Sequence, residues 1–168
     1  KEVRLFELSE VFIDIGETLP KETLHLAGIL YKEKGPALWR DDTEGFYILK
    51  GVTESLFERL RVTGFSFSPS VEPFLHPGKS SDLYIDGEKA GFAGYLSPDT
   101  IDRLGLKSRT EVMVFDIDME KALGHISGKI IYRPIPRFPS IERDISIVLD
   151  DGITSASVIG LIKSFRSE

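Results

Sequence analysis

Asp86 and Gly87 form the strongest turn signal in this sequence, because they stand between two runs rich in apolar residues, 82–85 and 90–95. A two-residue hairpin loop of type I′ needs a positive φ at both central positions, and Asp-Gly is one of the pairs that adopts it most readily. The sequence therefore predicts a β-hairpin around this dipeptide.

The tripeptide Gly78-Lys79-Ser80, just before this hairpin, resembles the end of a phosphate-binding loop. The complete motif G-x-x-x-x-G-K-[ST] has another glycine five residues before the second one, and Pro73 occupies that position. A phosphate-binding loop also leads into a helix whose N–H groups bind the phosphates, whereas this tripeptide leads into the predicted hairpin. The sequence therefore argues against a nucleotide site and favours a loop that opens the hairpin.

The remaining patterns up to residue 124 predict an α+β fold, an antiparallel sheet with flanking helices. One helix is expected within residues 44–64, and a second begins with the capping residue Ser97 and ends at Gly105. The apolar stripe of the first helix consists of Leu49, Val52, Leu56 and Leu60. Further strands are expected at residues 3–13, 23–32, 65–74 and 111–117, and a short helical turn at 119–123 closes at Gly124.

The residue composition of the sequence changes after residue 124. Prolines at positions 134, 136 and 139 indicate an extended connector. Residues 143–151 then alternate apolar and polar side chains like a strand, and residues 154–165 have the spacing of an amphipathic helix. One strand and one helix cannot bury a core, so we expect the start of a second domain that is truncated here.

Composition excludes several classes of function. The chain has 168 residues with 41% hydrophobic and 29% charged residues, which is typical of a folded globular protein. It has no cysteine, so it has neither disulfides nor thiol catalysis. The net charge of −6 argues against nucleic-acid binding through a large basic surface, although a local RNA contact stays open. We expect a cytoplasmic protein without a membrane segment.

Side chains that could form a catalytic or metal site are interpreted as structural. The three histidines are far apart in sequence, and a zinc site needs three or four converging ligands. The aspartate pairs at positions 41 and 42, 99 and 102, and 116 and 118 lack a sign of acid–base function. Gly91 and Gly94 are expected to let a neighbouring backbone or helix come close.

Basic residues gather around the proline-rich connector, and two interpretations remain open for them. Lys129, Arg133, Arg137 and Arg143 are partly offset by acidic neighbours at positions 142 and 144. They form either a solvated edge of mixed charge or an RNA contact. The candidate RNA-binding residues are Arg137, Arg143 and Lys163.

The order of these segments resembles the bacterial phenylalanine–tRNA synthetase β subunit over essentially the whole chain. The resemblance rests on "RLFELSEVF", "LAGIL" followed by a tryptophan, "PFLHPGKSSDLYIDGEKAGFAGYLSP", "VFDIDMEKAL" and "YRPIPRFPSIERDISIVLD". It implies that residues 1–123 are the later part of a class II synthetase catalytic-like domain without an active site. It also implies a linker at residues 124–133 and the start of a ferredoxin-fold anticodon-binding domain at residues 134–168.

The residues agree with a lost active site. The resemblance implies that a working site would hold ATP with two arginines, one of them where a glycine-rich strand enters a helix. The corresponding junction here is Ser97-Pro98-Asp99, without an arginine before Arg103. Asp99 would oppose a phosphate rather than stabilise it. Arg4 resembles the other of the two ATP-binding arginines, but one arginine alone cannot perform the roles of both.

The resemblance further implies a catalytic α subunit and tRNA as partners, in a tetramer of two α and two β chains. The whole enzyme would use ATP and magnesium to attach phenylalanine to tRNA, and this fragment would hold no cofactor and no metal and would be inactive alone. Two alternatives remain: a stand-alone RNA- or protein-binding module that uses the edge between Arg133 and Arg143, and an independent enzyme that uses His76 with a nearby carboxylate.

Overall fold

The computed structural model describes residues 2–33, 44–106, 110–127, 132, 137 and 141–165. Contacts between residues divide the chain into two compact units, Lys1–Ile130 and Ile131–Glu168.

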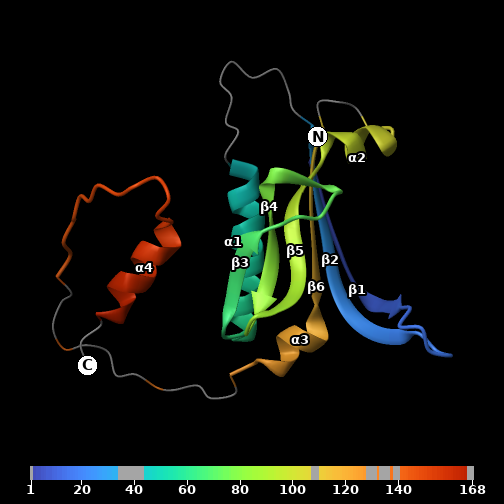
Figure 1. Cartoon of the computed structure of the whole chain (residues 1–168), viewed down its shortest axis with the longest axis horizontal. Coiled ribbons are helices and arrows are strands. Elements are labelled where there is room, and N and C mark those ends of the chain that lie inside the picture. Colours follow the sequence, from blue (N-terminus) through green and yellow to red (C-terminus); the bar gives the residue numbers. More distant parts are fainter. Residues whose placement is uncertain are drawn as a thin grey trace. The chain divides into compact units, whose positions relative to one another are not determined.

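Six strands of the first unit form one antiparallel sheet (Figure 1). They are β1 (Glu2–Ile13), β2 (Lys21–Glu33), β3 (Phe65–Pro69), β4 (Leu75–Ile85), β5 (Glu88–Leu96) and β6 (Thr110–Asp118). Their order across the sheet is β1-β2-β6-β5-β4-β3, so the last strand in sequence lies between the second and the fifth. The predicted antiparallel α+β architecture is confirmed, and β3 is an edge strand as expected for a segment that contains prolines.

The predicted hairpin joins β4 to β5. Asp86 has a φ of 48° and Gly87 a φ of 85°, as a type I′ turn requires, and Ile85 pairs with Glu88. Close backbone approach at the glycines of β5 is also confirmed. A Cβ added at Gly91 would collide with the carbonyl oxygen of Asp116, and one added at Gly94 would collide with Ser80.

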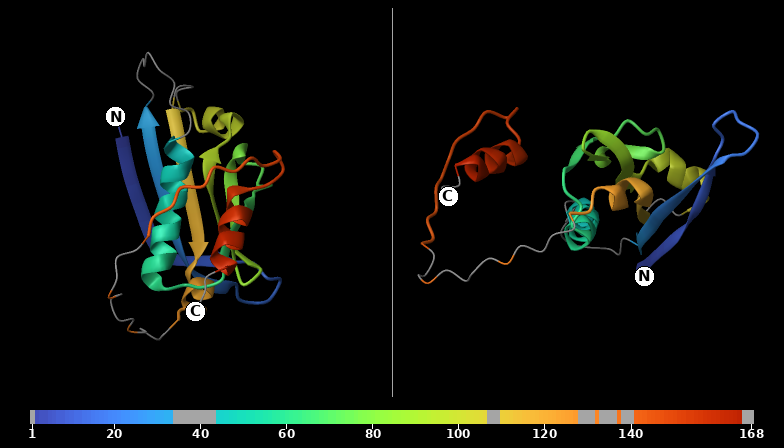
Figure 2. Two further views of the ribbon diagram at one scale, coloured as in Figure 1. Left: turned by 90° about the vertical axis from the view of Figure 1, so that its left-hand side faces the viewer. Right: turned by 90° about the horizontal axis from the view of Figure 1, so that it is seen from below.

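Helix α1 (Glu44–Leu60) lies against one face of the sheet (Figure 2). Leu49 and Phe57 are completely buried there and join the core with residues of β5 and β6. The predicted stripe is wrong at Val52, which is 42% exposed. Thr53, one residue further along, is the buried position, because its hydroxyl donates to the Lys50 carbonyl oxygen (2.8 Å) and needs no outside partner.

The two faces of the sheet differ in what covers them. Met113, Phe115 and Ile117 of β6 point toward α1 and belong to the core. Since side chains alternate along a strand, Val114 and Asp116 point to the opposite side, which we call the open face. Beyond the end of β6, β1 and β2 continue as a curved hairpin, because residues 21–24 of β2 pair only with β1 (Figure 2).

Two short helices follow the predicted signals. Helix α2 (Pro98–Arg103) begins after Ser97, whose side chain caps it, and Gly105 with a φ of 68° follows its end. Helix α3 (Met119–Gly124) is capped by the Asp118 side chain, which accepts from the backbone N–H of Lys121 (3.1 Å). Each helix buries side chains within the first unit: Ile101 from α2, and Met119 and Ala122 from α3.

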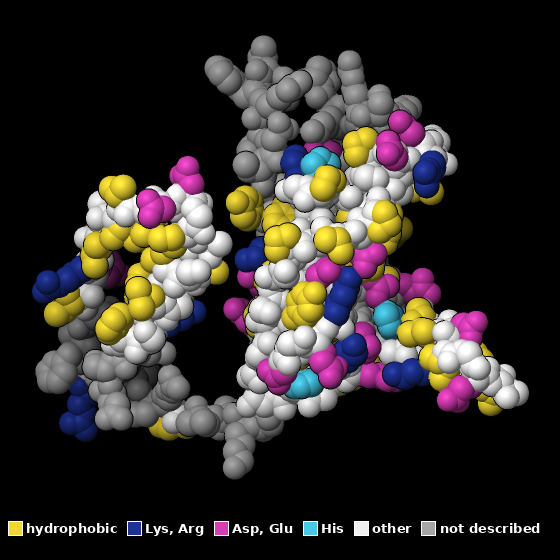
Figure 3. Space-filling view, viewed as in Figure 1, with side chains coloured by type: hydrophobic (Ala, Val, Ile, Leu, Met, Phe, Trp, Pro, Cys, Tyr) yellow, Lys and Arg dark blue, Asp and Glu magenta, His cyan; other side chains and the backbone are white. Residues whose placement is uncertain are grey.

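The second unit contains helix α4 (Ser155–Ser164), which confirms the predicted helix there. The predicted strand at residues 143–151 is not a strand in the structure, since residues 141–152 have no ladder partner among the described residues. A strand needs a neighbour for its backbone hydrogen bonds. Leu161, Ile162 and Phe165 are consequently exposed, and hydrophobic side chains lie on the surface of this unit (Figure 3).

Most of the proline-rich connector lies outside the described residues, so the prediction for it is untested. In the described part of the chain, no helix combines the length and the apolar character needed to cross a membrane.

Candidate functional site

The junction between β5 and α2, where the resemblance implies a nucleotide-binding arginine, is held by hydrogen bonds to Phe74. The Ser97 N–H donates to the Phe74 carbonyl oxygen (2.9 Å), and the Thr100 hydroxyl donates to the same oxygen (3.2 Å). The Ser97 hydroxyl accepts from the Thr100 N–H (3.3 Å) and so caps the helix. The polar groups of this junction therefore hold the segment before β4 in place.

No basic residue stands at the start of α2. Asp99 occupies the first helical turn, where the helix dipole favours a negative charge, and Arg103 occupies the last turn. Arg4 lies on β1, where its Nε donates to Glu2 Oε1 (2.7 Å), and its side chain is 65% exposed. Arg4 and Arg103 thus lie on separate elements, β1 and α2, and Arg4 is paired with the Glu2 carboxylate.

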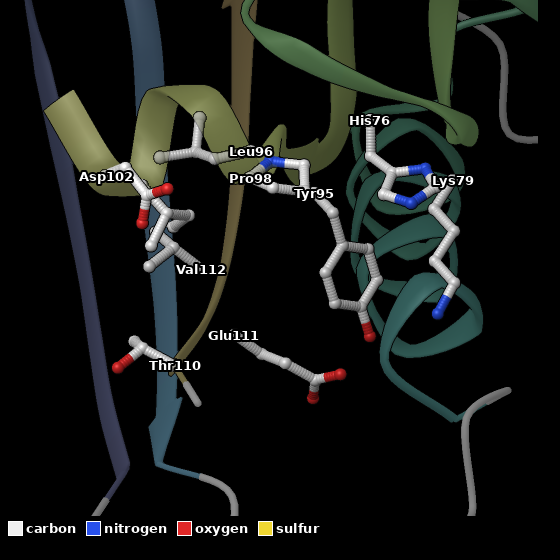
Figure 4. A pocket seen from close by; sticks show the side chains of 10 residues that line it. His76, Lys79, Tyr95, Leu96, Pro98, Asp102, Thr110, Glu111 and Val112 are labelled. Carbon is white, nitrogen blue, oxygen red and sulfur yellow. The ribbon is translucent and has the colours of Figure 1, made fainter. Parts of the chain in front are cut away.

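A cleft of about 310 Å³ lies beside this junction; we call it the α2 cleft. Lys79 from β4 and Tyr95 from β5 reach into it (Figure 4), with the ammonium 5.3 Å from the centre of the Tyr95 ring. Asp102 and Glu111 also line the cleft. Its lining therefore combines one ammonium, stacked on an aromatic ring, with two carboxylates.

The phosphate-loop-like tripeptide lies inside strand β4, which continues into the hairpin and not into a helix. The Gly78 N–H donates to His76 Nδ1 (3.1 Å), and the Ser80 hydroxyl donates to the His76 carbonyl oxygen (2.8 Å). These local hydrogen bonds shape the irregular part of β4, where the pairing with β5 shifts between Leu75 and Ser80. The predicted loop is therefore wrong at these residues, because they belong to strand β4 and Ser80 pairs with Gly94 of β5.

The histidines lie at three separate places, each with its own partner. His25 pairs with Asp116 across β2 and β6. His125 lies 3.2 Å from Asp86 and also contacts the Lys121 carbonyl oxygen. In the part of the chain that the structure describes, no three histidine or acidic side chains converge as metal ligands.

Both members of one aspartate pair have structural partners. Asp116 binds His25, and Asp118 caps α3. Asp99 and Asp102 are exposed on α2. The pair at positions 41 and 42 lies outside the described residues.

The three candidate RNA-binding residues are all in the second unit and are all exposed. Arg143 belongs to the segment without a strand partner, and Lys163 lies in the last turn of α4. Within the described residues of this unit, no hydrogen bond or ion pair joins one of the three side chains to another. Their role in RNA binding stays a prediction.

A second hollow, which the sequence reasoning missed, lies on the open face. We call it the open-face groove; its volume is about 640 Å³. It is mainly apolar, and Glu7 and Asp116 are the charged residues of its lining. No local motif marks it, because its residues come from four strands and from the segment before β4.

Comparison with known proteins places this antiparallel domain among aminoacyl-tRNA synthetase chains. Residues 1–119 match the family model described as the phenylalanyl tRNA synthetase beta chain CLM domain. The chain therefore belongs to this family, which confirms the resemblance seen in the sequence.

The similar curated proteins carry the same family name. The phenylalanine–tRNA ligase beta subunit of Halalkalibacterium halodurans is 34% identical over 170 residues, which cover 98% of this chain and 21% of that protein. The beta subunit of Moorella thermoacetica is 36% identical over 169 residues, covering 99% of this chain and 21% of that protein. The chain thus spans about a fifth of the length of these relatives.

Proposed function

We propose that this chain is a non-catalytic, structural and tRNA-docking part of a phenylalanine–tRNA ligase beta subunit. In the whole enzyme it supports an α subunit that attaches phenylalanine to tRNA with ATP and magnesium, in a tetramer of two α and two β chains. The observation that carries this proposal is the family match over residues 1–119, together with a β5–α2 junction that has no basic residue at the helix start.

We further propose that residues 1–123 are a class II synthetase-like domain that has lost its active site. The antiparallel sheet with α1 on one face supports this assignment. Residues 134–168 are proposed to begin a ferredoxin-like domain that binds tRNA, after a linker at residues 124–133. The exposed apolar side chains of α4 support this, because such a stripe needs further elements to cover it.

The residues of the α2 cleft do not fit a nucleotide triphosphate. Binding would require cationic or N–H groups directed at the phosphates. The cleft offers the Lys79 ammonium, but Asp102 and Glu111 add negative charge beside it, and α2 carries Asp99 in its first turn. This lining supports the proposal that the α subunit of the whole enzyme holds ATP and magnesium.

Calorimetry tests the loss of the substrate site. Titration of the 168-residue chain with magnesium-ATP, and separately with phenylalanine, should give no heat beyond dilution. The assembled α and β enzyme serves as the positive control and should bind both. Micromolar affinity of this chain alone for either compound would overturn the proposal of a non-catalytic domain.

Truncation tests the proposed domain boundary. Removal of residues 134–168 should leave the melting temperature of the first unit nearly unchanged, since its core residues all lie before residue 123. A fall of more than about 5 °C, which corresponds to roughly 1 kcal/mol for a domain of this size, would show that the two parts fold as one.

A further inference from the structure

The open-face groove is built from two rows of side chains that the strand register brings together. One row consists of Glu7, Ala27, Asp116 and Phe92, which are successive partners across β1, β2, β6 and β5. The neighbouring row consists of Leu5, Ile29, Val114 and Gly94 on the same strands. Directly paired residues point to the same face of a sheet, so all of these side chains share the open face.

A small residue hollows out the groove. Ala27, with its single methyl group, separates Glu7 from Asp116 in the first row. Adjacent strands lie about 4.8 Å apart, so the Cα atoms of Glu7 and Asp116 are about 10 Å apart. A volume of about 640 Å³ lies within the range of small-molecule sites.

The apolar wall of the groove suits an aromatic ring. The rings of Phe74 and Phe92 contact each other edge to face with centres 5.1 Å apart, which fixes Phe92 beside the floor. The floor consists of Ile29 and Val114, and the exposed Leu5 stands at the side of β1. An inserted ring would bury apolar area and gain an aromatic contact with this pair.

The charge of the groove is negative. Glu7 and Asp116 line it, and no lysine or arginine belongs to the lining. His25 binds Asp116 Oδ1, while the Asp116 side chain keeps 29% of its surface exposed. A carboxylate that is half withdrawn from water favours a cation that can donate hydrogen bonds to it.

We propose that the open-face groove binds a primary arylalkylammonium ion. Its ring lies against Ile29, Val114 and Phe92, and its ammonium donates to the carboxylates of Glu7 and Asp116. Organic anions are rejected by the same carboxylates, and a free amino acid is disfavoured because it carries a carboxylate beside its ammonium. This ligand class differs from ATP and phenylalanine, so the inference stands independently of the proposed function.

Two probes of the same shape test the charge requirement. The 168-residue chain is titrated with 3-phenylpropylamine and, at equal ionic strength, with 3-phenylpropionate, and amide chemical shifts are followed by NMR. The amine should shift the amides of Ala27, Ile29 and Val114 in a saturable way, with a Kd of millimolar or tighter. The acid should leave these amides unshifted.

Variants of β1 locate the binding side. Glu7→Gln should weaken the amine about fivefold, because it removes one of the two carboxylates. Glu10→Gln is the matched control, since Glu10 lies on the same strand with its side chain on the other face, and it should leave the affinity unchanged. Asp116→Asn should also weaken binding. If the Asp116→Asn variant unfolds because it loses the contact with His25, the Glu7→Gln variant still tests the proposal.

Three results would overturn the proposal. The first is equal binding of the amine and the acid, and the second is an equal loss of affinity in the Glu7 and Glu10 variants. The third is the absence of saturable shifts in the groove up to about 10 mM amine, a concentration that corresponds to a binding free energy of only about −3 kcal/mol. A dimer found by sedimentation together with that third result would identify the open face as a self-association surface.

Discussion

Lys89 Nζ lies 3.1 Å from Asp82 Oδ2 and thereby pairs β5 with a buried carboxylate of β4. The same ammonium donates to Glu72 Oε1 (2.6 Å), and the Ser70 hydroxyl donates to Asp82 Oδ1 (2.7 Å). Burial of the ammonium alone lowers the pKa of Lys89. The hydrogen bonds and charges of Glu72 and Asp82 outweigh burial and raise this pKa above its ordinary value of 10.5.

Replacement of Lys89 should destabilise the first unit. Lys89→Met leaves Asp82, whose side chain is 6% exposed, without its cationic partner. We expect a loss of about 1–2 kcal/mol, below the usual cost for a buried pair because Lys89 itself is 38% exposed. Urea unfolding measures the change. Arg4→Met, which removes an exposed pair with Glu2, is the control and should change stability by less than about 0.5 kcal/mol.

The same network predicts a dependence on alkaline pH. Because the pKa of Lys89 is raised in the folded state, its contribution is fully present below the ordinary value of 10.5 and is lost as the pH rises through the raised pKa. The stability difference between the wild-type chain and Lys89→Met should therefore persist up to about pH 10.5 and shrink over the range above it, as the pH rises through the raised pKa. A difference that stays constant over this range would contradict a charged interaction at Lys89.

Two glycines should respond to alanine in opposite directions. A Cβ at Gly94 would meet the Ser80 side chain and approach the backbone of β4, so Gly94→Ala should cost about 1–3 kcal/mol. Gly51 lies inside α1 with no atom within 4 Å of an added Cβ, so Gly51→Ala should stabilise the chain by about 0.5–1 kcal/mol. Thermal unfolding of both variants checks the signs, and a stable Gly94→Ala variant would show that β4 and β5 are less closely paired.

The proposed tRNA contact predicts a change in salt dependence. If Arg137, Arg143 and Lys163 each bind a phosphate, each alanine variant should lower the slope of log K against log salt by about 0.7–0.9. Filter binding of cognate and non-cognate tRNA across a salt series measures this slope. Arg103→Ala, on α2 of the first unit, is the control and should leave it unchanged. Equal slopes for all four variants and the wild type would rule out these contacts.

Local signals predicted the elements of the first unit because each depends on few neighbouring residues. The Asp86-Gly87 turn, the Ser97 cap and the end of α2 at Gly105 are set by backbone conformation over one or two residues. The errors arose where distant partners decide. Val52 had the right spacing for the core but is exposed. The alternating segment at residues 143–151 has no strand beside it in the described structure.

The sequence by itself determined where the chain turns, where its helices begin, and to which family it is similar, since these properties are written in short runs of neighbouring residues. Only the tertiary structure decided that β6 inserts between β2 and β5 and that Glu7 and Asp116 share one row of the open face. These residues are far apart in the chain, and a shift of one residue in register would send either side chain to the opposite face. The packing of the core against α1 fixes that register, and therefore also fixes the groove.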